Sequence, residues 1–117
     1  MYSVVIPVFN EEANIQPLYQ SLTSVMKTIG DYEIIFVDDG STDSTFTHIK
    51  ELHTHDKKIK CLRFRKNFGQ TPALRAGFDF AHGDYIITID GDFLVMTHLV
   101  NGSFPNFLIG WLAVLPV

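Results

Sequence analysis

Four short apolar runs, separated by segments of helical periodicity, constrain the fold of this chain more than any other feature. The runs are 3–8, 33–37, 59–64 and 85–89. They are rich in β-branched and aromatic residues, as strands buried on both faces are. An order of β-α-β-α-β-α-β indicates an α/β fold with a parallel sheet and right-handed crossovers. At 117 residues, the chain is long enough for one such domain.

Three apolar stripes at helical spacing lie between the strands, and the first includes Leu22, Val25 and Met26. Residues that favour helix starts precede each stripe. The expected caps, in chain order, are Asn10; Ser41, Thr42 or Asp43; and Thr71, which precedes a proline. Within the third helix, Gly77 is small enough to allow close contact with the sheet.

Polar residues follow every expected strand at its carboxyl end. They are Asn10, Glu11 and Glu12; Asp38 and Asp39; Arg65, Lys66 and Asn67; and Asp90 and Asp92. Ligands of open parallel sheets bind beyond this edge. No comparable set is expected at the amino ends. The sequence therefore predicts one polar rim that carries the functional site.

The residue types in this rim suggest a nucleoside-diphosphate site. Two carboxylates as close as Asp90 and Asp92 favour a divalent cation, and Mg²⁺ or Mn²⁺ binds through such carboxylates together with substrate phosphates. Arg65 suits phosphate, Asp38 or Asp39 suits a base or ribose hydroxyl, and Phe9 offers a flat face for a base. Each residue also has an ordinary alternative role in a turn or cap.

Other features of the sequence narrow the function. Neither the G-x-G-x-x-G nor the G-x-x-x-x-G-K-[ST] fingerprint occurs, which argues against NAD enzymes and P-loop NTPases. A net charge of −4 argues against nucleic acid as a partner. The single cysteine, Cys61, is expected to be a buried structural thiol. The chain begins without a basic leader, so we expect no signal peptide.

Three motifs resemble those of family 2 glycosyltransferases, which have the GT-A fold. They are Val4-Val5-Ile6-Pro7-Val8-Phe9-Asn10-Glu11-Glu12, Val37-Asp38-Asp39-Gly40-Ser41-Thr42-Asp43 and Asp90-Gly91-Asp92. A fourth stretch, residues 65–70, resembles the branch that glycosylates polyprenyl phosphates, such as the dolichol-phosphate mannosyltransferases. The resemblance covers residues 3–92.

The resemblance implies an inverting transfer of a sugar from a UDP- or GDP-sugar, with Mg²⁺ or Mn²⁺. It implies that Pro7, Phe9 and Glu11 line the nucleoside pocket. By the same resemblance, Asp39 would bind the nucleotide's base, with Asp38 nearby. Asp90 would approach the ribose and the metal, and Asp92 the metal and the diphosphate. Asn10, Arg65 and Asn67 complete the expected nucleotide-binding set. Phe9 departs from the family's more frequent tyrosine, which keeps stacking but loses a hydroxyl.

The sequence departs from the family after Asp92. We therefore divide it into a donor-binding part, 1–92, and an atypical apolar tail, 93–117, and expect a truncated domain with little activity alone. A frame disruption near Phe93 would explain the change. His98 is the only ionisable residue of the tail, and we assign it no catalytic role. The apolar run 107–117 is too short to span a bilayer as a helix.

Several expectations about partners follow. The acceptor is a lipid phosphate or a saccharide, and the location is the cytoplasm or the cytoplasmic face of a membrane. The apolar tail would contact a membrane surface or a second copy. A nucleotide-sugar-binding module without catalysis is the main alternative. A phosphoacceptor signalling domain is disfavoured, because no later strand ends in the lysine that this class needs.

Overall fold

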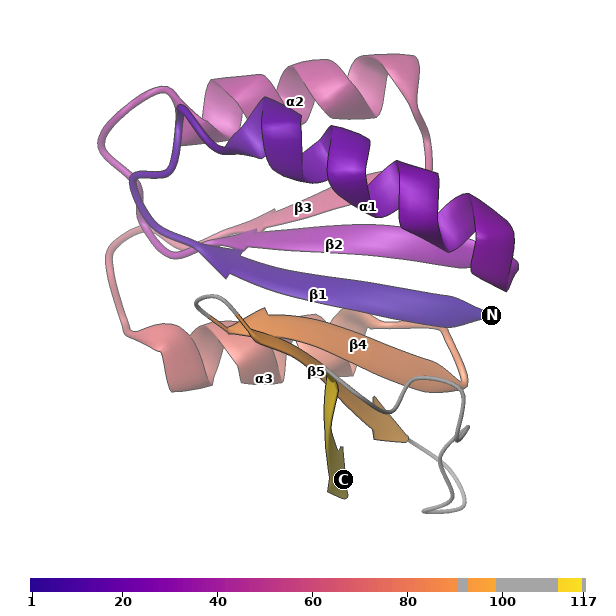
Figure 1. Ribbon diagram of the computed structural model, residues 1–117. Helices are drawn as coiled ribbons and strands as arrows, with labels where there is room; N and C mark the ends of the chain where they lie inside the picture. Colours follow the sequence, from indigo (N-terminus) through magenta and orange to yellow (C-terminus); the bar gives the residue numbers. More distant parts are fainter. Residues whose placement is uncertain (91–92, 99–111, 117) are drawn as a thin grey trace.

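The computed structural model describes residues 1–90, 93–98 and 112–116, with side chains for residues 1–89 (Figure 1). Its elements are β1 (Tyr2–Val8), α1 (Ile15–Ile29), β2 (Tyr32–Asp38), α2 (Thr45–His55), β3 (Ile59–Arg63), α3 (Gln70–Phe80), β4 (Tyr85–Asp90), β5 (Phe93–His98) and β6 (Leu112–Pro116). The predicted alternation of strands and helices is confirmed through β4.

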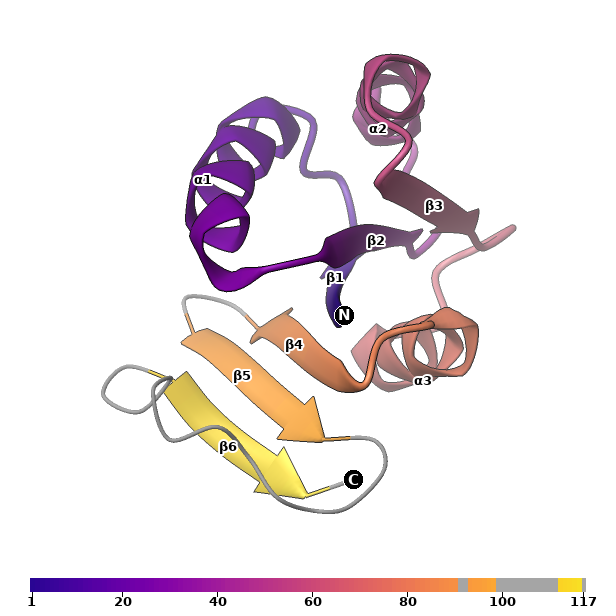
Figure 2. The same cartoon turned by 90° about the vertical axis from the view of Figure 1, so that its right-hand side faces the viewer.

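One six-stranded sheet runs through the molecule in the order β3-β2-β1-β4-β5-β6. The first four strands are parallel, β5 pairs antiparallel with β4, and β6 pairs parallel with β5. Figure 2 shows α1 and α2 on one face of the sheet and α3 on the other. The sequence predicted the four parallel strands but not β5 and β6. The proposed boundary at residue 92 stays a prediction.

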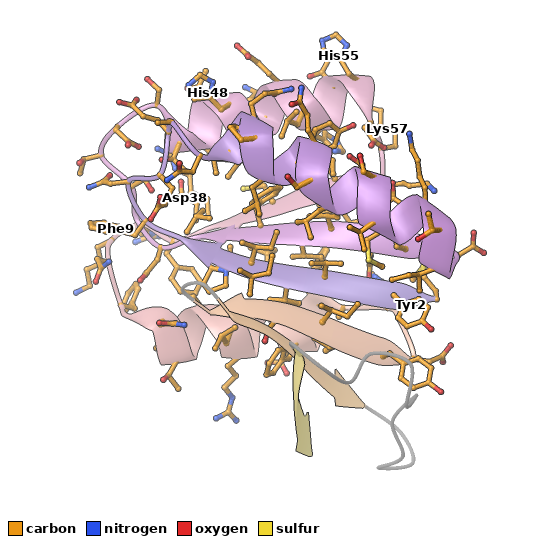
Figure 3. All side chains as sticks on the ribbon, in the orientation of Figure 1. Tyr2, Phe9, Asp38, His48, His55 and Lys57 are labelled. Carbon is orange, nitrogen blue, oxygen red and sulfur yellow. The ribbon has the colours of Figure 1, made fainter. Side chains whose placement is uncertain are left out.

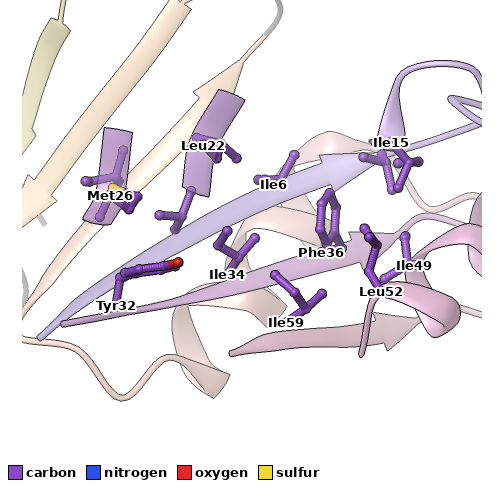
Figure 4. Close-up of a cluster of buried hydrophobic side chains, with 13 residues drawn as sticks. Ile6, Ile15, Leu22, Met26, Tyr32, Ile34, Phe36, Ile49, Leu52 and Ile59 are labelled. Atoms are coloured by element: carbon purple, nitrogen blue, oxygen red, sulfur yellow. The ribbon is translucent and has the colours of Figure 1, made fainter. Parts of the chain in front are cut away.

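The core has two parts because the central strands are buried on both faces. The larger cluster lies between the sheet and the helices α1 and α2, and Phe36, Ile15 and Ile49 are fully buried in it (Figure 4). The smaller cluster lies under α3 and includes Val5 and Ala73. Neighbouring residues of a strand point to opposite faces, which explains the continuous apolar runs in the sequence.

The predicted helix starts are wrong by one to four residues. Asn14, not Asn10, precedes α1, and Asn10 instead has a left-handed backbone with φ 51°. Ser44 precedes α2, and Gly69 rather than Thr71 precedes α3. Asn10 was misplaced as a cap because its side chain bonds across a loop to Thr42, whereas Asp43 does accept the N–H of Thr45 at the start of α2.

Two expectations for the helix faces had opposite outcomes. Val25, expected in the buried stripe of α1, is 44% exposed. Gly77 does allow close contact between α3 and the sheet, since a Cβ atom there would lie 2.2 Å from Cγ1 of Val5. A side chain at position 77 would therefore push α3 away from β1.

Candidate functional site

The carboxyl ends of the first three parallel strands meet in one row. Val8 of β1 pairs in register with Asp38 of β2, which pairs with Arg63 of β3. Figure 3 shows Phe9 and Asp38 at this end of the sheet and Tyr2 at the other. The loops that leave these strands therefore share one rim, as the strand order predicted.

Asp39 joins the end of β2 to the loop before α3. Its carboxylate accepts hydrogen bonds from the backbone N–H groups of Phe68 (2.7 Å) and Gly69 (3.0 Å) and from Nδ2 of Asn67 (3.2 Å). A carboxylate offers about four acceptor positions, so the described residues occupy three of them and leave one. Although Asp39 is only 5% exposed, it contributes to the surface of a cleft described below.

Gly40 lets the same two loops approach each other closely. Its φ is +76°, a left-handed conformation that glycine adopts without strain. A Cβ atom at this position would lie 2.3 Å from the backbone carbon of Lys66. Backbone atoms cannot move aside as the end of a side chain can. The hydrogen bonds between Asp39 and the loop before α3 therefore depend on a glycine at position 40.

A second set of bonds ties the loop after β1 to the loop after β2. Asn10 donates its backbone N–H to Oγ of Ser41 at 2.9 Å, and its Oδ1 accepts the N–H of Thr42 at 2.8 Å. Glu11 donates its N–H to Oγ1 of Thr45 at 2.8 Å, and Glu12 accepts the N–H of Ser44 at 3.0 Å. Asn10 and Glu12 therefore brace the loops.

Asp43 completes this brace at the start of α2. Burial alone would raise the pKa of its carboxyl group, but hydrogen bonds from the side chain and N–H of Thr45 and from the N–H of Glu12 outweigh it. The pKa is therefore lowered. The carboxylate stays charged at the positive end of the helix, where a negative charge is stabilising.

A cleft of about 330 Å³ opens at this rim. It is lined by Pro7, Val8, Phe9, Glu11, Asp39, Asn67, Gly69, Gln70 and Ile89. Five of the predicted nucleotide-binding residues lie here together: Pro7, Phe9, Glu11, Asp39 and Asn67. The ring of Phe9 is 42% exposed. The volume lies within the range of about 300–1,000 Å³ that small-molecule sites occupy.

Three predicted residues do not line this cleft. Asp38 is fully buried, with Oδ1 accepting the N–H of Ser41 at 3.0 Å and Oδ2 lying 3.9 Å from Nε of Arg63. Arg65 lines a separate hollow with Arg63 and Gly40. Asn10 acts in the loop brace. Their predicted contacts with a nucleotide stay predictions.

The predicted metal ligands lie at the edge of what the structure describes. Only the backbone of Asp90 is described, and Asp92 lies outside the described residues. Ile89 lines the cleft, and Asp90 is the next and last residue of β4. Among side chains 1–89, no three His, Cys, Asp or Glu residues are grouped to hold a metal ion.

A polar cluster at the amino ends of the strands was missed, and the expectation of none there is wrong. Glu33 is 2% exposed, accepts hydrogen bonds from Oγ of Ser3 (2.6 Å) and the N–H of His82 (2.7 Å), and pairs with Nζ of Lys60 at 2.7 Å. Burial would raise its pKa, but these partners lower it to about 2. The available signal was a glutamate opening an otherwise apolar strand.

The Cys61 thiol was expected to be buried. It lies half-buried in β3, and burial together with the nearby Asp38 raises its pKa to about 12. A thiol with such a pKa is not a nucleophile at neutral pH.

No described helix is both long and apolar enough to cross a bilayer.

Relatives of the chain are glycosyltransferases. An uncharacterized glycosyltransferase, YkcC, of Bacillus subtilis is 44% identical over 92 residues, covering 78% of this chain and 28% of the relative. A prophage bactoprenol glucosyl transferase homolog of Escherichia coli is 42% identical over 105 residues, covering 85% and 34%. The chain thus spans about a third of the length of these relatives.

Solved structures share the fold. S. aureus TarS 1-349 in complex with UDP-GlcNAc has a TM-score of 0.65 at 30% identity and covers 78% of this chain and 26% of that one. Glucosyl-3-phosphoglycerate synthase from Mycobacterium tuberculosis, with Mn²⁺, UDP and phosphoglyceric acid, has a TM-score of 0.59 at 28% identity, covering 79% and 33%. The model of glycosyl transferase family 2 matches residues 3–102, and the chain belongs to that family.

Proposed function

We propose that this chain forms the donor-binding part of an inverting glycosyltransferase that takes a sugar from a UDP- or GDP-sugar. The observation that carries the proposal is the cleft at the carboxyl edge of the sheet, which brings together the ring of Phe9 and the carboxylate of Asp39. An apolar ring beside an acceptor with spare capacity suits a nucleoside base.

Within this cleft we assign separate tasks to the residues. The exposed face of Phe9 would stack on the base, an interaction that tolerates any base. The remaining acceptor position of Asp39 would take a base N–H, since its other positions already hold Asn67, Phe68 and Gly69. Glu11 lines the cleft where a ribose would lie. Its Oε2 accepts a hydrogen bond from Nδ2 of Asn14 at 2.6 Å.

A divalent cation, Mg²⁺ or Mn²⁺, would be held by Asp90 and Asp92. Carboxylate oxygens are the donors that these hard cations prefer, and β4 brings Asp90 to the edge of the cleft. The Mn²⁺ and UDP in the synthase from Mycobacterium tuberculosis support this assignment. When bound, the cation would neutralise charge on the diphosphate leaving group.

We propose a polyprenyl phosphate as the acceptor and the cytoplasmic face of a membrane as the location. The bactoprenol glucosyl transferase homolog of E. coli supports this acceptor class over a free saccharide. A lipid phosphate is already an anion, so it attacks without a general base.

A second candidate is a module that binds the nucleotide sugar without transferring it. The observation in its favour is that the cleft with Phe9 and Asp39 would serve binding alone equally well. The two candidates share the cleft and differ in turnover. One experiment therefore separates them.

Calorimetric titration with UDP and GDP, in Mn²⁺ and in EDTA, tests the site without requiring activity. We expect binding of at least one nucleotide that weakens tenfold or more in EDTA. Incubation with UDP- or GDP-sugars and a polyprenyl phosphate then measures transfer. Metal-dependent binding with transfer supports the glycosyltransferase, and binding without transfer supports the module. If neither nucleotide binds in Mn²⁺, both candidates fail.

A further inference from the structure

Basic residues are concentrated in one stretch of this acidic chain. Seven of the nine Lys and Arg residues fall between positions 50 and 66, alongside only two acidic residues. The remainder of the chain holds two basic and eleven acidic residues. The overall charge of −4 therefore conceals a strongly positive segment.

The fold gathers this segment on one edge of the molecule. It comprises the second half of α2, the turn after α2, the edge strand β3 and the loop toward α3, at the opposite edge of the sheet from β6 (Figure 2, right-hand side). We call this surface the basic edge. Its members are Lys50, Lys57, Lys58, Lys60, Arg63, Arg65 and Lys66.

Most of these charges are not neutralised within the described part of the chain. Lys60 pairs with Glu33, and Arg63 lies 3.9 Å from Asp38. The other five cations form no ion pair with any of the side chains 1–89. Of the two acidic residues, Asp56 is engaged by the hydroxyl of Tyr19 and the N–H of Lys58. Uncompensated cations this close repel one another, and an anionic surface would relieve the repulsion.

Aromatic rings lie beside the cations. The guanidinium of Arg63 lies 4.2 Å from the ring of Phe46, and Nζ of Lys66 lies 5.2 Å from the ring of Phe68. Nζ of Lys60 lies 6.0 Å from the ring of Phe80, at the end of α3. Phe68 and Phe80 are 54% and 38% exposed. Surfaces that lie on a membrane combine two kinds of side chain. Cations contact the lipid headgroups, and aromatic rings enter the boundary between headgroups and acyl chains.

We propose that the basic edge docks this protein onto an anionic lipid surface. Arg65 and Lys66 connect the edge to the rim, so docking would hold the donor cleft beside the plane of the headgroups. This placement goes beyond the proposed membrane location by naming the surface that makes the contact. The proposed docking surface does not depend on the proposed donor binding, which is measured without vesicles.

A protected strand edge and a nucleic-acid partner both account for the basic edge less well. Lysines on an edge strand prevent sheets from pairing edge to edge, but here cations also occupy α2 and the loop after β3, where no strand edge needs protection. A nucleic acid would also attract the cations. Eleven acidic residues on the remainder of the chain oppose a polyanion that wraps around the protein, whereas a flat membrane meets only one edge.

Flotation with vesicles tests the proposal on the full chain. The probes are vesicles of phosphatidylcholine with phosphatidylglycerol, and vesicles of phosphatidylcholine alone. The test variant is Lys50→Glu/Lys57→Glu, which reverses two exposed charges outside the donor cleft. The control is Lys27→Glu/Arg75→Glu, which makes the same change in net charge at exposed sites on α1 and α3.

We expect binding to the anionic vesicles only, and weaker binding as salt is raised. The test variant should bind about 30-fold more weakly or worse, because each basic side chain near an anionic surface contributes about 1 kcal/mol and 1.4 kcal/mol is tenfold. The control should bind as the unaltered chain does. Circular dichroism of both variants reports whether they fold.

Four outcomes would overturn the proposal. They are no binding to anionic vesicles, equal binding to neutral ones, equal losses in both folded variants, and tighter binding to duplex RNA or DNA than to vesicles at the same salt. UDP and GDP titrations without vesicles are run in parallel. Donor binding that survives a failed flotation assay would leave the proposed function standing without this surface.

Discussion

Phe9 combines exposure with rigidity at the rim. It follows β1 directly, keeps 42% of its surface exposed and lines the cleft beside Asp39. The neighbouring residue, Asn10, is held by bonds to Ser41 and Thr42, so the backbone that carries the ring is fixed. A ring fixed before binding loses little entropy when a base stacks on it.

Replacing Phe9 by alanine should weaken UDP or GDP binding by about 5- to 160-fold, the equivalent of about 1–3 kcal/mol for one stacked base. Phe9→Tyr should bind as the unaltered chain does, because the ring is kept. Val25→Ala is the matched control, since Val25 is 44% exposed but lies on α1 outside the cleft. Calorimetry of the three variants checks the prediction. Equal effects of Phe9→Ala and Val25→Ala would contradict stacking on Phe9.

Gly40 is the second single residue on which the cleft depends. An alanine there should lower the free energy of unfolding by about 2–4 kcal/mol, since a left-handed backbone costs about 1–2 kcal/mol and the clash with Lys66 adds to it. Donor binding should fall as well, because relieving the clash moves Asn67 away from Asp39. Urea unfolding and calorimetry measure the two effects.

Gly30 provides the control for this substitution. It also has a positive φ, +149°, but the nearest atom to a Cβ there is 3.9 Å away, on Tyr2. Gly30→Ala should therefore cost stability through the backbone alone and leave donor binding unchanged. A loss of donor binding in Gly30→Ala equal to that in Gly40→Ala would show that general destabilisation, not the local clash, disables the cleft.

At the scale of elements, the seating of α3 on the sheet is set by Gly77. Alanine is favoured over glycine inside a helix by about 1 kcal/mol, but a Cβ here would lie 2.2 Å from Val5 Cγ1 and 3.2 Å from Val37 Cγ2. Overpacking costs about 1–3 kcal/mol. Since Val5 is fully buried, we expect Gly77→Ala to destabilise the protein by up to about 2 kcal/mol after the gain in helix propensity is subtracted.

A double substitution tests this packing argument. Val5→Ala alone should destabilise by leaving a cavity, whereas Val5→Ala/Gly77→Ala places the new methyl group where the valine was. The combined loss in urea unfolding should therefore be smaller than the sum of the single losses. Losses that add fully would contradict contact between these two positions.

The elements differ in how far the sequence predicted them. The four parallel strands were predictable because burial on both faces leaves long apolar runs, as in β2, where every residue is buried. Helix starts were not, because Asn10 bonds to Thr42 of a distant loop instead of capping α1. The strands β5 and β6 lie in uncharged sequence with no alternation between apolar and polar residues, and no local pattern marked them.

The site was predictable in part for a similar reason. Residues that follow parallel strands share an edge, which brought Pro7, Glu11 and Asn67 into one cleft. Asp38 and Asp39 could not be told apart by type. Consecutive residues of an extended chain point in opposite directions, and here Asp38 is turned into the interior whereas Asp39 faces the cleft.

On the scale of the whole molecule, polar clusters fasten both ends of the central strands. Asp39 joins loops at the carboxyl ends, and Glu33 joins β1, β2, β3 and the turn after α3 at the amino ends. Gly83 also belongs to the cluster at the amino ends, since its N–H donates a hydrogen bond to Oγ of Ser3 at 2.8 Å. The cleft therefore lies at the opposite end of the strands from Glu33, whose pKa is lowered to about 2.

Stability should fall in acid because of Glu33. Its pKa in the folded protein is about 2 against an ordinary value of 4.5. A lowered pKa stabilises the fold above the unfolded value, and this contribution of about 3 kcal/mol is lost as the pH falls from 4.5 to 2. Urea unfolding across this window measures the slope of the free energy of unfolding against pH.

Glu33→Gln should flatten this slope, and Glu33→Gln/Lys60→Met should do so without leaving an unpaired lysine against the buried site. Asp84→Asn is the control, because Asp84 is 70% exposed and, among side chains 1–89, its ion pair is with the terminal amine alone. A slope that persists in both Glu33 variants would assign the acid sensitivity to other carboxylates.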